Sequence, residues 1–244
     1  MLNILISAIK VIFLLGILVF IHELGHFTVA KIFKVRVNEF AIGFGPTLWK
    51  KQGKQTKYAL RLIPLGGFVS MEGEEERSES EGSFSEAKVY KKILIVAAGA
   101  IVNIIFAIIL YFFLVWYYND LSYAFMGIKD FVFSIWLSLK MLFTGGVSIN
   151  EMMGPVGISS VVAKTSGIAD FIYILSVISL SLGVTNLLPF PPLDGGKIVL
   201  LIIEGITKKP INPKVENIIQ MTGFVLIILL SIIVANNDIL RIIK

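Results

Sequence analysis

Long apolar runs separated by polar segments dominate this chain of 244 residues. A helix needs roughly 20 mainly apolar residues to cross the hydrocarbon core of a bilayer, which is about 30 Å thick. Four runs reach that length, and they cover about residues 2–27, 93–118, 171–193 and 215–235. The pattern predicts a mainly α-helical membrane protein with about four transmembrane helices. We expect residues 1–244 to form a single domain.

The segment after the first run has a different period. Residues 35–71 contain two stretches with partial alternation of apolar and polar positions, separated by the polar turn KKQGKQ. This pattern is typical of a β-hairpin, which we expect to lie against the membrane face. Residues 72–92 are rich in Glu, Ser and Gly without apolar periodicity, so we interpret them as a solvated acidic loop.

Composition and charge narrow the class of protein. Charged residues make up only 16% of the chain, against about a quarter in soluble domains. The absence of cysteine excludes disulfides and cysteine-ligated metals. The net charge of +5 does not indicate a nucleic-acid partner, because the basic residues are not gathered in one soluble segment. They collect between the first two runs and after residue 194, and the positive-inside rule places these segments on the cytoplasmic side of a cell-membrane protein.

The first run ends in FIHELGHF, which contains the pattern H-E-x-x-H at His22, Glu23 and His26. Positions i and i+4 share one face of a helix, so both imidazoles can reach one metal ion, with the carboxylate beside them. The alternative is a pair of buried histidines hydrogen-bonded to their neighbours. Three ionisable side chains in a membrane span are costly unless a metal or a water-filled cavity offsets them. A zinc site is therefore the favoured interpretation.

Catalytic zinc usually has three protein ligands, and without cysteine or another histidine the third must be a carboxylate. Only Asp194 ends an apolar run on the side where the first run also ends, and two glycines follow it. The remaining candidates are Asp120, Asp130, Glu151, Asp170, Glu204 and Glu216. Alone, Asp194 could be an exposed turn residue, but beside H-E-x-x-H metal ligation is the better interpretation.

The segment 123–143 is apolar enough to span a membrane but carries Lys129, Asp130 and Lys140. An additional crossing here would place Asp194 on the opposite face from His22. We therefore interpret the segment as an interfacial helix before the third transmembrane helix. It belongs to an outer interfacial segment of about residues 123–168.

The motifs together resemble those of the site-2 protease family of intramembrane zinc metalloproteases. The resemblance is carried by HELGH, by NLLPFPPLDGG, by IPLGGFVSM in the hairpin and by GPVGI after the interfacial segment. The bacterial members most similar to this chain, which act in regulated intramembrane proteolysis, carry one or two PDZ domains after the second span. This chain has only about residues 119–123 there, so it resembles a member that lacks the PDZ domain.

The resemblance implies a Zn²⁺ ion held by His22, His26 and Asp194, with Glu23 as general base and acid. It also implies that an extended substrate is held by a strand and two asparagines: Gly66, Gly67, Phe68, Asn186 and Asn103. The implied activity is hydrolysis of peptide bonds in or near transmembrane segments of membrane-protein or signal-peptide substrates. No organic cofactor is expected.

Two other classes of function remain open from the residues alone. A zinc transporter or sensor would use the two histidines but has no special need for the carboxylate between them. An inactive relative that binds transmembrane helices would keep the fold without the chemistry. A Glu23→Gln substitution that removes cleavage but spares zinc binding distinguishes the protease from both.

Overall fold

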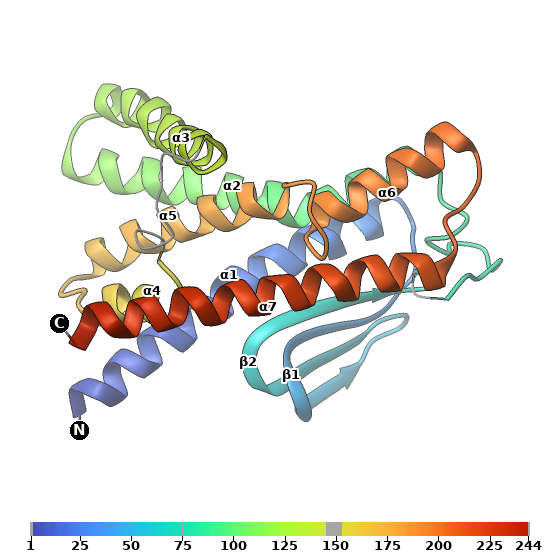
Figure 1. Cartoon of the computed structure of the whole chain (residues 1–244), viewed down its shortest axis with the longest axis horizontal. Coiled ribbons are helices and arrows are strands. Elements are labelled where there is room, and N and C mark those ends of the chain that lie inside the picture. The colour runs from blue at the N-terminus through green and yellow to red at the C-terminus, as the bar shows by residue number, and fades with distance from the viewer. Residues whose placement is uncertain (1, 75, 145–152, 244) are drawn as a thin grey trace. The chain divides into compact units, whose positions relative to one another are not determined.

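The computed structural model describes residues 2–74, 76–144 and 153–243. Its elements in chain order (Figure 1) are α1 Leu2–Ile32, β1 Val37–Gln52, β2 Lys57–Met71, α2 Val89–Tyr118, α3 Leu121–Phe143, α4 Pro155–Ala163, α5 Ile168–Asn186, α6 Asp194–Thr207 and α7 Pro213–Ile243. Among the described residues, α1, α2, α5 and α7 are long and apolar enough to cross a membrane. The predicted class is therefore confirmed, with a hairpin after the first of these helices and α3 before the third. The location of α3 in the membrane interface stays a prediction.

The third transmembrane helix is shorter than the apolar run that predicted it. α5 ends at Asn186 rather than at residue 193, and the chain turns through residues 187–193 before α6 begins at Asp194. Three prolines in this turn explain the break, because proline has no N–H to donate and its ring clashes with the preceding helical turn. The second transmembrane helix begins earlier than predicted. α2 starts at Val89 rather than at residue 93, so the acidic loop predicted over residues 72–92 ends at residue 88.

Contacts divide the described chain into two compact units. One contains residues 1–11, 105–181 and 224–244, and the other contains residues 12–104 and 182–223. Each of the four long helices contributes one part to each unit. The expectation of a single domain over residues 1–244 stays a prediction.

In the first unit, α3 packs on α2 and α4 is tied to α7. The rings of Tyr111 and Phe131 stack with their centroids 4.1 Å apart. The buried carboxylate of Asp238 accepts hydrogen bonds from the backbone N–H groups of Gly154 at 3.0 Å and Gly157 at 2.8 Å, at the start of α4. The outer segment expected at residues 123–168 thus includes two helices, and its residues 145–152 lie outside the described part of the chain.

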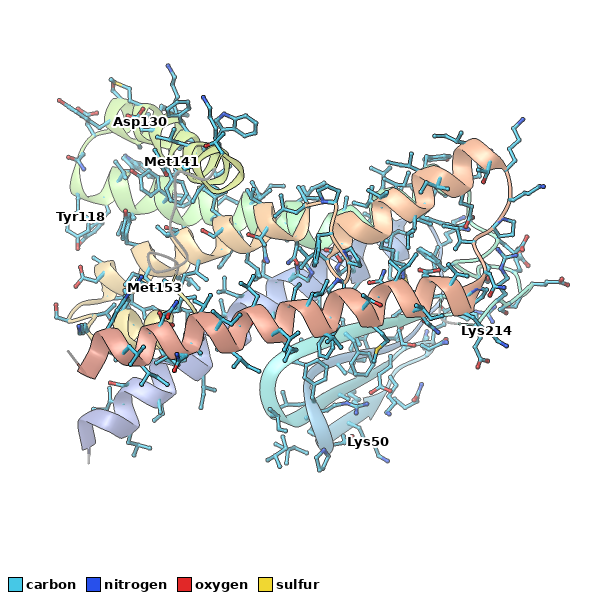
Figure 2. The ribbon with its side chains drawn as sticks, in the orientation of Figure 1. Lys50, Tyr118, Asp130, Met141, Met153 and Lys214 are labelled. Atoms are coloured by element: carbon cyan, nitrogen blue, oxygen red, sulfur yellow. The ribbon has the colours of Figure 1, made fainter. Side chains whose placement is uncertain are left out.

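In the second unit, β1 and β2 form the predicted hairpin as a two-stranded antiparallel sheet. Both strands are strongly curved (Figure 1), and consequently residues 39–42 of β1 have partners in two separate parts of β2. Phe40, for example, is paired with both Val69 and Tyr58. The side chain of Lys50 projects from the sheet towards the outside of the unit (Figure 2).

An apolar core joins this sheet to the end of α1, the start of α2 and α6. Its buried residues are Ala30, Val35, Val37, Phe40, Val69, Met71, Phe84, Ile95, Val96 and Leu201. Phe84 belongs to the segment predicted to be solvated, and with 4% of its surface exposed it anchors the acidic loop in this core. Burial of one aromatic side chain stabilises such an anchor by roughly 1.5–3 kcal/mol.

α1 and α2 approach each other closely at a pair of glycines. A Cβ atom on Gly25 would lie 2.5 Å from the carbonyl oxygen of Ala98 and 2.9 Å from the Cα atom of Gly99. On α5, a Cβ atom on Gly183 would lie 2.7 Å from the carbonyl oxygen of Ala100. Small residues allow transmembrane backbones to come into contact. The short stretch 98–100 of α2 is therefore in backbone contact with both α1 and α5.

Candidate metal centre

His22 and His26 lie one turn apart on α1 and face the same point. Their Nε2 atoms are 3.2 Å apart, and their rings meet edge to face with centroids 4.8 Å apart. Glu23 lies between them in the sequence, and its side chain is partly buried. The i, i+4 spacing therefore does what the sequence predicted, because it brings two imidazole nitrogens together on one helix face.

Asp194 in the first turn of α6 completes a triangle with the two histidines. Its Oδ2 atom lies 3.3 Å from His22 Nε2 and 3.6 Å from His26 Nε2. Tetrahedral ligands at about 2.0–2.1 Å from one zinc ion are roughly 3.3 Å from each other. The three potential ligand atoms therefore have the spacing of three corners of a zinc tetrahedron.

The hydrogen bonds of the three side chains leave acceptor atoms facing the centre of the triangle, as expected for a site that binds a cation. His26 Nδ1–H donates to the carbonyl oxygen of Ile95 at 2.9 Å, which leaves a lone pair on His26 Nε2 facing the triangle. Asp194 Oδ2 is buried and has no hydrogen-bond donor among the described residues. A buried carboxylate oxygen without a donor is costly unless it is paired with a cation or coordinates a metal. This orphaned oxygen is the observation that most favours a metal ion at this point.

The expected candidate Asn103 lies on the other side of His22. Its side-chain amide is fully buried and 3.4 Å from His22 Nδ1. With the amide oxygen turned towards the ring, Nδ1–H donates to it and Nε2 is left free for a metal. Asn103 is therefore placed to orient a histidine, whereas the resemblance assigned it to the substrate.

Glycines allow other segments to approach the triangle. A Cβ atom on Gly99 would overlap His26 Nε2 and lie 2.8 Å from His22 Cε1. On α6, a Cβ atom on Gly196 would lie 2.7 Å from the backbone nitrogen of Pro191. Asp194 is thus positioned by a turn that folds closely over the first turn of its own helix. A carboxylate there is also favoured by the positive end of the helix dipole.

The predicted substrate strand lies beside Glu23. A Cβ atom on Gly67 of β2 would lie 3.0 Å from Cγ of Glu23 and 3.0 Å from Cγ1 of Val19, so only glycine fits there without displacement. Gly66 has a positive φ of 139°, and Phe68 lies with its ring 5.0 Å from the guanidinium group of Arg61. The structure therefore brings Gly67 to the candidate site, together with the strand that carries it.

A cavity of about 630 Å³ extends from Asp194 along this strand. Phe68, Val69 and Ser70 line one side of it, and residues of α6 and the start of α7 line the other. Two ion pairs border the cavity: Glu74 with Lys197, and Lys92 with Glu204 at 2.8 Å. The cavity wall consequently combines charged and apolar side chains, which suits a peptide better than a lipid chain.

Among the described residues, no hydrogen bond or ion pair joins the remaining predicted site residues to the three potential ligands. Asn186 is the last residue of α5, seven residues before Leu193, and the hydrogen bonds of the described residues include none from its side chain. Glu151, one of the alternative carboxylates, lies outside the described residues. Among the described His, Asp and Glu residues, only His22, His26 and Asp194 form a group that could hold a metal ion.

Sequence reasoning missed three contributors to the site, namely the Ile95 carbonyl, Gly25 and Gly99. The carbonyl carries no sequence signal, because every residue has one. The glycines did carry a signal, since small residues in an apolar span indicate a close helix crossing. The pair Glu74 and Lys197 was also missed, because it joins a loop to a helix more than a hundred residues away.

Comparison with known proteins gives a consistent set of relatives. The sequence profile of peptidase family M50 matches residues 10–230. A Clostridium acetobutylicum protein provisionally named a zinc metalloprotease is 28% identical, over 92% of this chain and 94% of that protein. A protein of Enterococcus faecalis provisionally named the protease Eep is 26% identical, over 96% of this chain and 99% of its own length. Zinc metalloprotease RasP of Shouchella clausii is 42% identical over 50% of this chain and 29% of RasP.

Proposed function

We propose that this chain, which belongs to peptidase family M50, cleaves membrane-protein or signal-peptide substrates in or near their transmembrane segments. The family and the four apolar helices make the chain a membrane zinc metalloprotease of the site-2 protease type. The class of substrate and the roles of individual residues are the proposal. The observation that carries them is the triangle of His22, His26 and Asp194 beside Glu23.

His22, His26 and Asp194 would hold the zinc ion. Their spacing of 3.2 to 3.6 Å matches a tetrahedral set that leaves one position open. Zinc at this site would supply a Lewis acid that makes water more acidic and polarises the scissile carbonyl. Asn103 and the Ile95 carbonyl would hold the two rings in the orientation that presents Nε2 to the ion.

Glu23 would move the protons of the reaction. Its carboxylate accepts a proton from the attacking water and later donates that proton to the leaving amine nitrogen. Glu23 directly follows His22 in α1, and Gly67 of the substrate strand approaches its Cγ atom. The same proximity explains why a residue without a side chain, Gly67, lies over Glu23.

The strand at Gly66, Gly67 and Phe68 would hold the substrate in an extended form. A transmembrane helix has its amides hydrogen-bonded internally, so it must unwind before a nucleophile can reach a peptide bond. Among the described residues, this end of β2 is paired with β1 on one side only, and a peptide can add to its other edge. Asn186, at the end of α5, would also bind the substrate backbone, as the family resemblance implies.

The active site would open towards the cytoplasmic side of the cell membrane. His22 and His26 lie in the last third of α1, and the lysine-rich hairpin and loop follow directly. The positive-inside rule assigns that end of the helix to the cytoplasm. The lipid bilayer and transmembrane substrates are accordingly the expected partners.

The proposal is tested with purified protein in detergent, using a single-span substrate and measuring zinc content in the same preparations. Wild type is expected to hold about one zinc ion and to cleave the substrate. Glu23→Gln is expected to hold as much zinc but to lose cleavage by a factor on the order of 10²–10⁴, the usual contribution of a general base. Glu79→Gln makes the same chemical change in the acidic loop, away from the site, and should behave as wild type.

Cleavage that survives in Glu23→Gln would refute the proposed mechanism. Zinc binding without cleavage in wild type, across several substrates, would instead favour a transport or sensing function for the same three ligands.

A further inference from the structure

A second cavity, of about 570 Å³, lies where α1 ends and α2 begins. The end of α1, the turn between β1 and β2, the acidic loop and the first turn of α2 all contribute to its lining. Six charged side chains line it: Lys31, Lys34, Arg36, Lys91, Glu81 and Glu86. Four positive and two negative charges leave a net charge of +2.

The charges in this cavity are not neutralised by one another. Among the described residues, none of the six belongs to an ion pair with N···O within 4.0 Å. Cations elsewhere in the same unit do find carboxylates, and these are Lys57, Arg61, Lys92 and Lys197. In the cavity, the Nζ atoms of Lys31 and Lys91 lie over the rings of Phe27 and Phe33 instead, which offer attraction but no negative charge.

The backbone, not only long side chains, forms this cavity. The N–H of Arg36 donates to the carbonyl oxygen of Gly82 at 2.8 Å, and Arg36 Nη2 donates to the carbonyl oxygen of Glu81 at 3.1 Å. Gly82 has a φ of 81°, and a Cβ atom there would lie 3.2 Å from the carbonyl oxygen of Lys34. The acidic loop is therefore fixed against the end of α1, and the cationic groups surround a defined space.

The cavity lies at the ends of two candidate membrane spans. Lys31 is in the last turn of the span Leu5–Ile32, and Lys91 is in the first turn of the span Val89–Tyr118. The connection between them, through residues 33–88, contains no candidate span among its described residues, so both ends emerge on one side of the bilayer. Headgroup phosphates occupy that level of a membrane, and the N-terminal end of α2 adds a dipole that favours an anion.

We propose that this cavity binds the phosphate of an anionic lipid headgroup from the leaflet on the lysine-rich side. Basic pockets between transmembrane helices are suited to such headgroups, because lysine and arginine side chains that are not in an ion pair there attract negative charge. The inference requires only that α1 and α2 span the bilayer. It does not depend on proteolysis or on the identity of the substrate.

The test uses the full chain in a neutral detergent and counts bound lipids by native mass spectrometry. The probes are short-chain phosphatidylglycerol, short-chain phosphatidylcholine and sodium phosphate. Wild type is expected to retain one phosphatidylglycerol molecule at concentrations where phosphatidylcholine does not bind. A triple variant, Lys34→Gln, Arg36→Gln and Lys91→Gln, should bind phosphatidylglycerol more weakly by a factor on the order of 100.

A matched control removes the same charge from exposed lysines outside both cavities, with Lys208→Gln, Lys209→Gln and Lys214→Gln. The side chain of Lys214 points outward at the start of α7 (Figure 2), and this triple variant should retain wild-type lipid affinity. Glu81→Gln with Glu86→Gln should tighten binding, an outcome that misfolding cannot produce.

Three results would overturn the proposal. Equal weakening in both triple variants would indicate diffuse surface charge. Equal retention of phosphatidylcholine would indicate that the cavity does not distinguish an anionic headgroup from a zwitterionic one. Binding of inorganic phosphate as tight as that of phosphatidylglycerol would assign the cavity to a soluble anion.

Discussion

The nitrogen and oxygen atoms that face the candidate zinc site are held in place by residues behind them. His26 donates through Nδ1–H to the Ile95 carbonyl, and His22 presents Nδ1 to the amide of the buried Asn103. A histidine that ligates through Nε2 must carry its proton on Nδ1, so a partner at Nδ1 selects the ligating form. The candidate site therefore includes six residues, because Ile95 and Asn103 join the three potential ligands and Glu23.

Replacing Asn103 tests this orienting role. Asn103→Leu should weaken zinc binding by a factor of about 10–100, the usual effect of losing a partner behind a ligand. Asn103→Asp keeps an acceptor for His22 Nδ1–H and should restore most of the affinity. Competition with a chromogenic chelator measures both values. Equal affinities in wild type and Asn103→Leu would show that His22 needs no partner at Nδ1.

A single methyl group at residue 99 should also disturb the site. In Gly99→Ala the new Cβ atom would overlap His26 Nε2, and the ring would have to move out of its position. We expect zinc affinity to fall by a factor on the order of 10–100, as for other displaced ligands. Gly16→Ala is the matched control, because a Cβ atom on Gly16 of α1 would meet nothing within 4 Å. A zinc affinity in Gly99→Ala equal to that of the Gly16→Ala control would contradict the geometry.

The sequence predicted the candidate ligands and Glu23 from patterns that are local to each segment. His22, Glu23 and His26 follow from helical spacing, and Asp194 follows from its place at the end of an apolar run. Asn103 could be assigned only in part and Gly99 was missed, because their distance to the histidines depends on how α1 and α2 cross. That crossing is set by backbone contact at Gly25 and Gly99, which no local period encodes.

At the scale of elements, one acidic residue links the two strands of the curved sheet. Glu39 of β1 contacts Lys57 Nζ at 3.0 Å and Arg61 Nη2 at 2.8 Å, both on β2. Burial raises the pKa of Glu39, but the hydrogen bonds and charges of Arg61 and Lys57 outweigh burial and hold the pKa below its ordinary 4.5. The carboxylate therefore stabilises the sheet most strongly when it is ionised.

This pKa gives the sheet a pH dependence of known sign. A carboxyl group whose pKa is lowered on folding contributes stability above its ordinary value, and this contribution is lost as the pH falls through the lowered pKa. Hydrogen-exchange protection of the β1 and β2 amides, corrected for intrinsic rates, should decline below about pH 4.5 in wild type. In Glu39→Gln it should already be lower at pH 7, by roughly 1 kcal/mol, and should vary less with pH. A decline of the same size in Glu39→Gln would rule out Glu39 as its source.

Helices and strands could be predicted wherever an apolar run or an alternating pattern continued over many residues. The four spanning helices and the hairpin follow from runs and alternation that hold over 15 residues or more. α6 was not predicted, because its apolar residues continue the pattern of α5 and only the intervening prolines separate them. The burial of Phe84 could not be predicted either, because one aromatic residue in an acidic loop gives no periodic pattern.

At the scale of the whole molecule, the predicted orientation in the membrane rests on the distribution of charge and not on packing. Residues 119–170 contain three lysines and no arginine, whereas the hairpin and its flanks are rich in both. Only Asn119 and Asp120 separate α2 from α3, so the connection between these two helices is minimal. Long-range features such as the cavity between residues 31 and 91 were beyond prediction, because they depend on how the loop folds back.

The absence of cysteine makes the orientation directly testable. Lys50→Cys in the hairpin should react with a membrane-impermeant maleimide only after cells are opened. Asp130→Cys, at an exposed position of α3 (Figure 2), should react from outside intact cells, and wild type should not react at all. The reverse labelling pattern would place the lysine-rich face outside and contradict the positive-inside assignment.

The most direct measurement of intramembrane proteolysis is the position of the cut bond. Wild type and Glu23→Gln would be reconstituted separately in lipid nanodiscs with a single-span substrate, and the products would be identified by mass spectrometry. We predict one main cut in wild type, within the apolar segment near its cytoplasmic end, and no cut with Glu23→Gln. A cut confined to the soluble part of the substrate, or the same cut in both proteins, would contradict hydrolysis at His22, His26, Asp194 and Glu23.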